Sequence, residues 1–404
     1  MKKYDAYKPS GIGWIGEIPE GWEKCRFKNF LTLINKPSIS DTKVGLENIE
    51  SGSGKYLPSD SEFDGNGVEF LIDDILYGKL RPYLMKVWVA EFTGNAVGDF
   101  FVFRAKKNAN PYFLKYLMLS DGFTKEADGA TEGAKMPRVS SEFIMSLRYY
   151  LPSKKEQIAI AYYLDAKCAN IDNVVAIQRK RIELLKELKQ SIITHAVTKG
   201  LDKTAKMKDS GIDWIGKIPE GWEKCRFKNF LILINKPSIS DAKIGLENIE
   251  SGSGKFLPSD SEFDGNGVEF IRNDIVYGKL RPYLMKVWVA EFTGNAVGDF
   301  FVFRAKKNAN PNFIKYLMLS DGYTKKADGA TVGAKMPRVS SNFILTLKYY
   351  LPSKEEQTAI ADYLDKKCTI INKQIAKVEK QIELLNEYKQ SVITECVTGK
   401  RKVC

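Results

Sequence analysis

Two basic segments of this chain carry side chains suited to contact a polyanion. The first, Tyr77–Lys86, places three cations and two aromatic rings within ten residues, and it recurs unchanged at Tyr277–Lys286. Lys and Arg neutralise phosphates, and Arg can also hydrogen-bond a guanine edge through two N–H groups. Gly78 and Pro82 indicate a loop from which these side chains could project together. The alternative interpretation is a solvated face with Tyr83 in the core.

The second basic segment is Lys135–Arg138, which recurs at 335–338, and a third candidate surrounds Ser51–Lys55. Amide and hydroxyl groups in the third segment could contact base edges or phosphates. Its Ser-Gly-Ser-Gly run is not a Walker loop, however, and is also typical of a turn. The predicted DNA-contacting residues are Lys43, Asn48, Lys55, Lys79, Arg81, Tyr83, Lys86, Lys135 and Arg138, with their copies Lys243, Asn248, Lys255, Lys279, Arg281, Tyr283, Lys286, Lys335 and Arg338.

Autonomous catalysis is not predicted. The single histidine, His195, excludes a Ser-His-Asp triad in each repeat and histidine-rich zinc sites. No Walker loop or GxGxxG motif is present, and the acids at 60–64 are not followed on a strand by the Glu-x-Lys of a metal nuclease. Asp73 is replaced by Asn273 in the second copy, which disfavours a catalytic acid there. We therefore expect no catalytic residue, metal or cofactor on this chain, and His195 is interpreted as an ordinary helix-end residue.

Composition favours a nucleic-acid partner and a reducing compartment. The 404 residues carry 62 Lys and Arg against 50 Asp and Glu, a net charge of +12, which favours an anionic partner. The six cysteines are scattered without a CxxC, and Cys25 and Cys168 are expected to be small buried groups. No run of about 18 apolar residues or apolar N-terminal segment occurs, so a cytoplasmic location is expected.

The sequence repeats at an offset of 200 residues. Residues 11–150 and 211–350 differ at 19 of 140 positions, whereas 151–198 and 351–398 differ at 19 of 48. Short apolar stretches between Gly- and Asn-rich turns, with a helical segment at Pro111–Ser120, indicate that each first part is an α/β (α+β) globular domain. The predicted boundaries are 1–152 for the first domain, 153–199 for a long helix, 200–210 for a linker, 211–352 for the second domain, 353–399 for a second long helix and 400–404 for a tail.

Each second part has the pattern of a coiled-coil helix. Ser153, with Glu156 three residues later, predicts the first helix start, and Lys199-Gly200 predicts its end. Apolar residues then step by three and four for five heptads and define a seam. A long helix with an apolar stripe needs a partner, and we expect the two helices of one chain to pair antiparallel; pairing between two chains is the alternative. The seam residues are Leu164, Cys168, Ile171, Val175, Ile182 and Leu185, with Leu364, Cys368, Ile371, Ile375, Ile382 and Leu385.

The order of these parts resembles the specificity (S) subunits of type I restriction-modification enzymes over essentially the whole chain. Each domain of that family opens and closes with short motifs, which are individually weak but specific in their tandem order with the heptad helices. One departure is Asn372 where the first copy has Asp172, and another is that family members usually carry two dissimilar domains. The matching motifs are Ile18–Trp22, Pro137–Ser140, Glu156-Gln157, Tyr163–Asp165 and Ile171-Asp172, and their copies Ile218–Trp222, Pro337–Ser340, Glu356-Gln357, Tyr363–Asp365 and Ile371-Asn372.

The resemblance implies a mechanism in which this chain is not itself catalytic. Two target recognition domains each read one half of a bipartite double-stranded DNA site, and the paired helices fix the unread spacer. Methyltransferase (M) subunits, expected to number two, dock on the helices and flip an adenine for methylation. Motor-nuclease (R) subunits complete the restriction complex. S-adenosylmethionine, ATP and Mg are then expected on the partner subunits and not on this chain.

The near-identity of the two domains predicts an inverted-repeat target. Like domains related by a twofold should read like half-sites in opposite orientations, with centres about one helical turn of DNA apart. Glu132, replaced by Val332 in the other copy, is the expected source of a one-base difference. Two other classes of protein remain open from the sequence. They are a stand-alone DNA-binding clamp or regulator, and a coiled-coil structural adaptor without steep salt-dependent DNA binding.

Overall fold

The computed structural model describes residues 3–59, 66–238, 240–259 and 266–403. The acidic stretch at 60–64 lies outside these residues. The chain divides into two compact units that do not follow sequence order. Unit 1 combines Met1–Arg179 with Lys380–Cys404, and unit 2 is Lys180–Glu379. Each unit therefore holds one α/β domain and one half of each long helix.

The first domain contains two four-stranded sheets and two strand pairs. The sheet orders are β4-β11-β8-β9 and β5-β7-β10-β6, and the pairs are β12-β3 and β1-β2. Every pairing is antiparallel except that of β6 with β10. The elements are β1 (Tyr7–Pro9), β2 (Glu17–Pro19), β3 (Glu23–Arg26), α1 (Phe27–Phe30), β4 (Leu31–Ile34), β5 (Pro37–Ser38), β6 (Lys43–Val44), β7 (Gly67–Phe70), β8 (Ile75–Gly78), β9 (Val87–Val89), β10 (Gly94–Ala96), β11 (Phe100–Ala105), α2 (Pro111–Met118), α3 (Asp121–Gly129), α4 (Ser141–Ser146) and β12 (Arg148–Leu151).

The second domain repeats this topology. Its sheets are β16-β23-β20-β21 and β17-β19-β22-β18, and its strand pairs are β15-β24 and β13-β14. The elements are β13 (Met207–Asp209), β14 (Lys217–Pro219), β15 (Glu223–Arg226), β16 (Leu231–Ile234), β17 (Pro237–Ser238), β18 (Lys243–Ile244), β19 (Gly267–Phe270), β20 (Ile275–Gly278), β21 (Val287–Val289), β22 (Gly294–Ala296), β23 (Phe300–Ala305), α6 (Pro311–Leu319), α7 (Asp321–Asp328), α8 (Ser341–Thr346) and β24 (Lys348–Leu351).

The segment 200–210, predicted to be a simple linker, contains strand β13. Met207 pairs with Pro219 and Lys208 with Ile218, so the segment is part of the second domain. Its polar composition hid the strand because β13 is a short edge strand with exposed side chains.

The two long helices are α5 (Lys154–Lys199) and α9 (Lys354–Val397). Ser153 caps α5 by accepting a hydrogen bond from the Glu156 amide at 3.3 Å. The Glu156 carboxylate does not complete a capping box and instead accepts from the Trp22 indole at 3.3 Å. Gly200 ends the helix in the left-handed region, with φ +71°.

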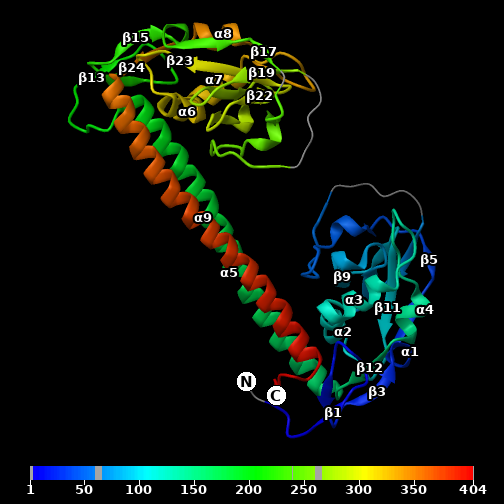
Figure 1. Cartoon of the computed structure of the whole chain (residues 1–404). Coiled ribbons are helices and arrows are strands. Elements are labelled where there is room, and N and C mark those ends of the chain that lie inside the picture. The colour runs from blue at the N-terminus through cyan, green and yellow to red at the C-terminus, as the bar shows by residue number, and fades with distance from the viewer. Residues whose placement is uncertain (1–2, 60–65, 239, 260–265, 404) are drawn as a thin grey trace. The chain divides into compact units, whose positions relative to one another are not determined.

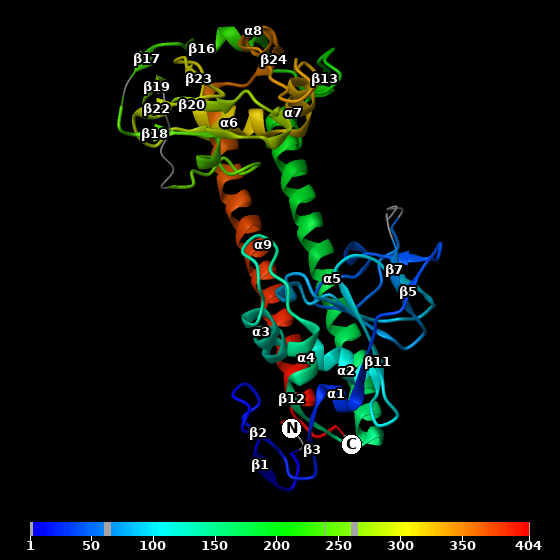
Figure 2. The ribbon, with the colours of Figure 1, turned by 90° about the vertical axis from the view of Figure 1, so that its right-hand side faces the viewer.

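In unit 1, the end of α9 packs antiparallel against the start of α5 and completes the core of the first domain (Figure 1). Val392, Ile393 and Val397 belong to the same buried cluster as Leu164 and Cys168. The buried Tyr149 hydroxyl of β12 donates to the Val397 carbonyl. Near the two chain ends, which Figure 2 shows at one side of this unit, the Tyr7 hydroxyl donates to the Gly399 carbonyl at 3.2 Å.

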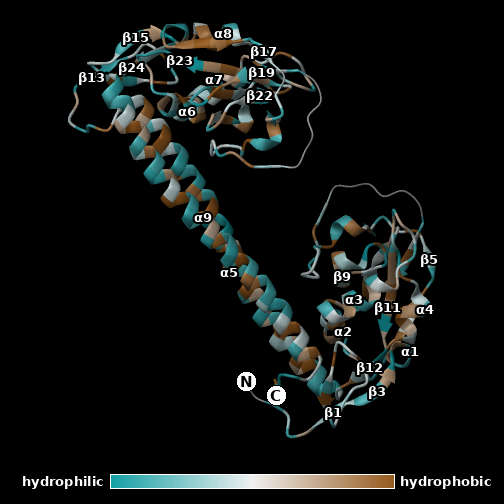
Figure 3. Ribbon diagram, in the orientation of Figure 1, coloured by the Kyte–Doolittle hydropathy of each residue, from teal (hydrophilic) through white to brown (hydrophobic). Residues whose placement is uncertain are grey.

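Unit 2 uses the same arrangement with the helices exchanged. The end of α5 contributes Ile193 and Val197 to a cluster with Leu364 and Cys368 at the start of α9. The Tyr349 hydroxyl of β24 donates to the Val197 carbonyl. The antiparallel pairing expected from the heptads is therefore present in each unit, and within one chain. Along α5 and α9 apolar and polar residues alternate, whereas the central strands are largely apolar (Figure 3).

Seam burial is deepest where the helices meet a domain. Leu164, Leu364, Cys168, Cys368 and Ile371 are at most 6% exposed. The seam residues further from the domains, Ile182, Leu185, Ile375, Ile382 and Leu385, are only partly buried. The domains therefore supply much of the apolar cover that the helices need.

Leu364→Ala should destabilise the full chain by about 2–5 kcal/mol, because it removes a fully buried side chain from the unit 2 cluster and leaves a cavity. Leu384→Ala, on the same helix but 51% exposed, should change stability by less than about 0.5 kcal/mol. Urea unfolding followed by circular dichroism at 222 nm measures both. Equal losses in the two variants would contradict the seam assignment.

Candidate nucleic-acid interface

Backbone hydrogen bonds bring the three predicted segments of the first domain together. The Arg81 amide donates to the Pro137 carbonyl at 2.8 Å, and the Val139 amide donates to the Lys79 carbonyl at 3.1 Å. The Gly52 amide donates to the Met85 carbonyl at 3.1 Å. Segments 79–86, 132–138 and 46–55, which are far apart in sequence, therefore form one continuous surface, which we call the basic surface. The same bonds join the copies in the second domain.

The centre of the basic surface is a strained turn. Arg81 and Met85 flank a 3₁₀ turn at Pro82–Leu84, and both have left-handed backbone angles, with φ 50° and 48°. The copies Arg281 and Met285 both have φ 49°. Left-handed angles cost a non-glycine residue about 1–2 kcal/mol, and such strain concentrates at functional sites. The strain presents the exposed Arg81 side chain and Tyr83, which is 51% exposed. The alternative that placed Tyr83 in the core is therefore wrong.

Asp99, which sequence reasoning did not single out, orients two of the predicted cations. Its carboxylate accepts from Arg138 Nε at 2.8 Å and from Nη2 at 3.0 Å. It also lies 4.0 Å from Lys79 Nζ. Asp299 makes the matching contacts in the second domain, where the Arg338 hydrogen bond holds the pKa of Asp299 below its usual range. Arg138 and Lys79 are thus held in place at the basic surface by Asp99.

Two predicted residues have structural roles instead of facing solvent. Asn48 is 1% exposed; its side-chain oxygen accepts from the Gly45 amide at 2.9 Å and its Nδ2 donates to the Leu57 carbonyl at 3.1 Å. Lys86 Nζ donates to the Leu46 and Ile49 carbonyls, both at 2.8 Å, and burial lowers its pKa. Both residues brace the third segment, because buried backbone carbonyls and amides need partners. Asn248 and Lys286 repeat these contacts, so all four are corrected from DNA-contacting to loop-bracing residues.

The other predicted residues lie at or near the surface. Lys135 and Lys335 are exposed in their loops, and Lys43 and Lys243 are half-buried in β6 and β18. Lys55 is exposed but forms an ion pair with Asp172 at 3.1 Å. Their contact with DNA stays a prediction.

The two domains differ in net charge although their predicted contact residues are the same. Residues 11–150 carry a net charge of −2 and residues 211–350 a net charge of +5. The predicted contact residues are identical in both, so the difference arises at other positions, among them Ile72→Arg272, Glu126→Lys326 and Glu132→Val332. Counterion release depends on such charges, so the second domain has the stronger nonspecific attraction for a polyanion.

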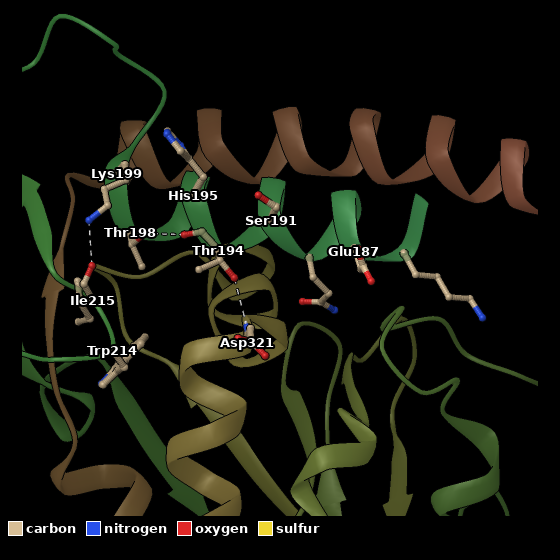
Figure 4. Close-up of a pocket in the computed structure, with 11 residues that line it drawn as sticks. Glu187, Ser191, Thr194, His195, Thr198, Lys199, Trp214, Ile215 and Asp321 are labelled. Atoms are coloured by element: carbon tan, nitrogen blue, oxygen red, sulfur yellow. Dashed lines mark hydrogen bonds between the residues drawn. The ribbon is translucent and has the colours of Figure 1, made fainter. Parts of the chain in front are cut away.

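A crevice in unit 2, of about 690 Å³, lies between the end of α5 and the second domain (Figure 4). Several of its polar groups are engaged in the fold. Lys199 Nζ donates to the Ile215 carbonyl at 2.9 Å, and the Asp321 amide donates to Thr194 Oγ1 at 3.3 Å. His195 is exposed near the helix end and its ring points away from Asp321 (Figure 4). Among the residues that the structure describes, no group of His, Cys, Asp and Glu could hold a metal ion.

Comparisons with known proteins agree with this architecture. A family model described as "Type I restriction modification DNA specificity domain" matches residues 219–383. The MjaVIII type I specificity subunit of Methanocaldococcus jannaschii is 24% identical over 96% of this chain and 94% of its own length. The EcoDI specificity subunit of Escherichia coli is 23% identical over 71% of this chain and 69% of its own length.

Two solved structures share the fold. A chain from a type I restriction-modification complex aligns with a TM-score of 0.75, at 16% identity, over 94% of this chain and 98% of that chain. The HsdS subunit from Thermoanaerobacter tengcongensis aligns with a TM-score of 0.54, at 18% identity, over 95% of this chain and 98% of that chain. The architecture of two like domains on long paired helices is therefore a fold that these two chains share.

Within the matched residues, 219–350 have a nearly identical counterpart at 19–150, so the similarity extends to the first copy. Residues 219–383 therefore match the type I restriction modification DNA specificity domain, and over almost its whole length the chain is similar to type I restriction enzyme specificity subunits. Such subunits recognise DNA, and catalysis lies on partner subunits. Within the described part of the chain, no helix is long and apolar enough to cross a membrane.

Replacing Arg81 and Arg281 together by Gly should leave the chain about 1 kcal/mol more stable than replacing both by Ala, because Gly adopts φ near 50° without strain. Both double variants lose the guanidinium groups, so both should bind cognate DNA equally weakly. Thermal unfolding and fluorescence anisotropy with labelled DNA measure the two effects. A Gly variant no more stable than the Ala variant would refute the strain, and unchanged DNA affinity would refute the contact.

Proposed function

We propose that each domain reads one half-site of a bipartite DNA target through its basic surface, and that the half-sites form an inverted repeat. The observation that carries this proposal is that the two basic surfaces differ only at Glu132 and Val332. None of the 19 differences between 11–150 and 211–350 falls on a predicted contact residue. Side chains of the same type, braced by the same bonds, should read the same bases.

The attachment of the domains supports the inverted orientation. The Tyr149–Val397 and Tyr349–Val197 hydrogen bonds join like domains to opposite helices of an antiparallel pair. A twofold relation between like parts inverts the strand that each part reads. The helices then set the unread spacer between the half-sites.

Partner subunits supply the chemistry in this proposal. Two methyltransferase subunits dock on α5 and α9 and methylate an adenine in each half-site, using S-adenosylmethionine. Motor-nuclease subunits add ATP- and Mg-dependent restriction. This chain binds none of these cofactors itself and acts in the cytoplasm, which suits its free thiols at Cys25, Cys168, Cys225, Cys368 and Cys396.

Single-molecule methylome sequencing tests the proposal. Cells expressing this chain with its neighbouring methyltransferase should show one inverted-repeat motif, with methyladenine on both strands, that disappears when the chain is omitted. Because the basic surfaces differ only at Glu132 and Val332, we expect the half-sites to match at all but about one position.

Two unlike half-sites would refute the symmetry and retain the subunit assignment. No chain-dependent methylation, with the methyltransferase shown to be folded, would favour a stand-alone clamp or an adaptor. Salt-dependent binding of this chain alone to DNA separates those two, because the clamp shows a steep dependence and the adaptor does not.

Glu132→Val should make the two half-sites alike where they differ. Val332 is 81% exposed beside the basic surface and could contact a thymine methyl, whereas Glu132 could accept from a cytosine amino group. Methylome sequencing of the variant should show a fully symmetric motif. Glu142→Asn, which also converts a residue of the first domain to that of the second, is the matched control and should leave the motif unchanged. An unaltered motif in Glu132→Val would exclude this residue from base reading.

A further inference from the structure

In unit 1, a single carboxylate contacts both the helix seam and the basic surface. Asp172 of α5 accepts from Lys389 Nζ of α9 at 2.7 Å through one oxygen and from Lys55 Nζ at 3.1 Å through the other. The Lys389 side chain is 11% exposed and Asp172 24%. Burial raises the pKa of Asp172, but the hydrogen bonds from the two lysines outweigh it and hold that pKa below its usual range. Asp172 is therefore ionised near neutral pH.

In unit 2, the same position is occupied by Asn372. Lys189 Nζ meets only the amide oxygen of Asn372, at 3.1 Å, and burial lowers the pKa of Lys189. Among the described residues, neither Lys189 nor Lys255 forms an ion pair. Lys255 lines instead an open groove of about 620 Å³, together with Lys189, Asn372 and Glu250.

The surroundings of this position are otherwise closely matched. The Gly52 and Gly252 amides both donate to a methionine carbonyl at 3.1 Å. Gln390 Nε2 lies 3.9 Å from the Met85 sulfur, and Gln190 Nε2 lies 3.7 Å from that of Met285. The segments 45–55 and 245–255 are identical in sequence. The chain thus contains a natural comparison in which the loop stays constant and its helix contact changes.

The ion pairs of Asp172 with Lys389 and with Lys55 have different roles. Lys389 is buried and would be costly without a counter-charge, so it fixes the carboxylate in place. Lys55 is 55% exposed, and a free surface pair of this kind contributes little. Because the carboxylate is already held by Lys389, however, Lys55 meets a preorganised acceptor and loses less entropy on pairing.

We propose that Asp172 is a positioning residue that clasps the 45–55 segment of the first domain to the helices, and that Asn372 leaves the 245–255 segment unclasped. The two domains then read alike but are held unequally. The less firmly held second domain lets the subunit accept a spacer one base pair longer or shorter than its preferred length. This consequence rests on the proposed function.

Hydrogen exchange of the full chain tests the clasp without DNA. Segments 45–55 and 245–255 have the same sequence, so their intrinsic exchange rates are closely matched, and peptides that extend to Tyr56 or Phe256 distinguish the two copies by mass. We expect 45–55 to exchange about tenfold more slowly, the scale of one hydrogen bond to a charged group. Asp172→Asn should raise its rate to that of 245–255, and Asn372→Asp should slow 245–255. Asn173→Asp adds an exposed carboxylate beside Asp172 and should change neither rate.

Equal hydrogen-exchange rates of the two segments in the unsubstituted chain would overturn the clasp. So would rates that change in neither Asp172→Asn nor Asn372→Asp. Thermal unfolding identifies a variant that fails to fold. If one variant fails, the hydrogen-exchange rates of the other variant decide whether the clasp exists. Neither result depends on DNA recognition.

Methylation in the presence of the methyltransferase tests the consequence. Target DNAs with spacers of the preferred length and one base pair to either side are compared. Asn372→Asp should lower methylation of the altered spacers about tenfold relative to the preferred one, and Asp172→Asn should raise it. If the hydrogen-exchange rates shift but the spacer preference stays constant, the proposed effect on spacer length is overturned and the clasp is retained. Absence of methylation in the unsubstituted protein would refute the proposed function and leave the clasp to the exchange result.

Discussion

The antiparallel pairing of two long amphipathic helices is the constraint on which the rest of the structure depends. A helix of 46 residues with an apolar stripe cannot persist alone in water. Here the stripe is covered in two halves, and each half is covered jointly by the other helix and a domain. The first domain therefore has no complete core without Val392, Ile393 and Val397, which follow it by more than two hundred residues. Domain and helix are in this sense one folding unit, and the compact units cross the order of the sequence.

This dependence explains why the two copies diverge as they do. Seam and junction residues face the same surroundings in both units, as the matching Tyr149–Val397 and Tyr349–Val197 hydrogen bonds show. The outer faces of the helices have no such constraint within the chain, and there Ile177 is exposed where the second copy has Lys377. Divergence on the outer face and retained apolar character at the junctions, as at Ile192/Val392 and Ala196/Cys396, are what a duplicated unit requires if its domains must be held in equivalent ways.

Sequence patterns were sufficient for the two repeated domains and the long helices, because these depend on local periodicity, whereas the grouping of the basic segments came from the fold. They were not sufficient for the roles of individual polar residues. Lys86 lies in the same basic run as Arg81, yet its ammonium points to the Leu46 and Ile49 carbonyls. Asn48 likewise serves a turn of its own loop. Asp99 was missed because its partners, Lys79 and Arg138, are brought to it only by the fold. A sequence shows which side chains carry charge, but which backbone groups need them is decided by tertiary structure.

The residues proposed to read DNA are distinct from those that fix each domain to the helices. A symmetric target requires matching contact residues in the two domains, and the predicted contact residues are identical in both copies. Placement on DNA requires in addition that each domain be fixed to the helices, and there the copies differ at Asp172 and Asn372. A buried lysine with a carboxylate partner holds its surroundings, whereas the partly buried Lys189 has only a hydrogen bond to a neutral amide to offset its desolvation. Two domains can thus share one recognition code and still differ in how tightly they define the distance between half-sites.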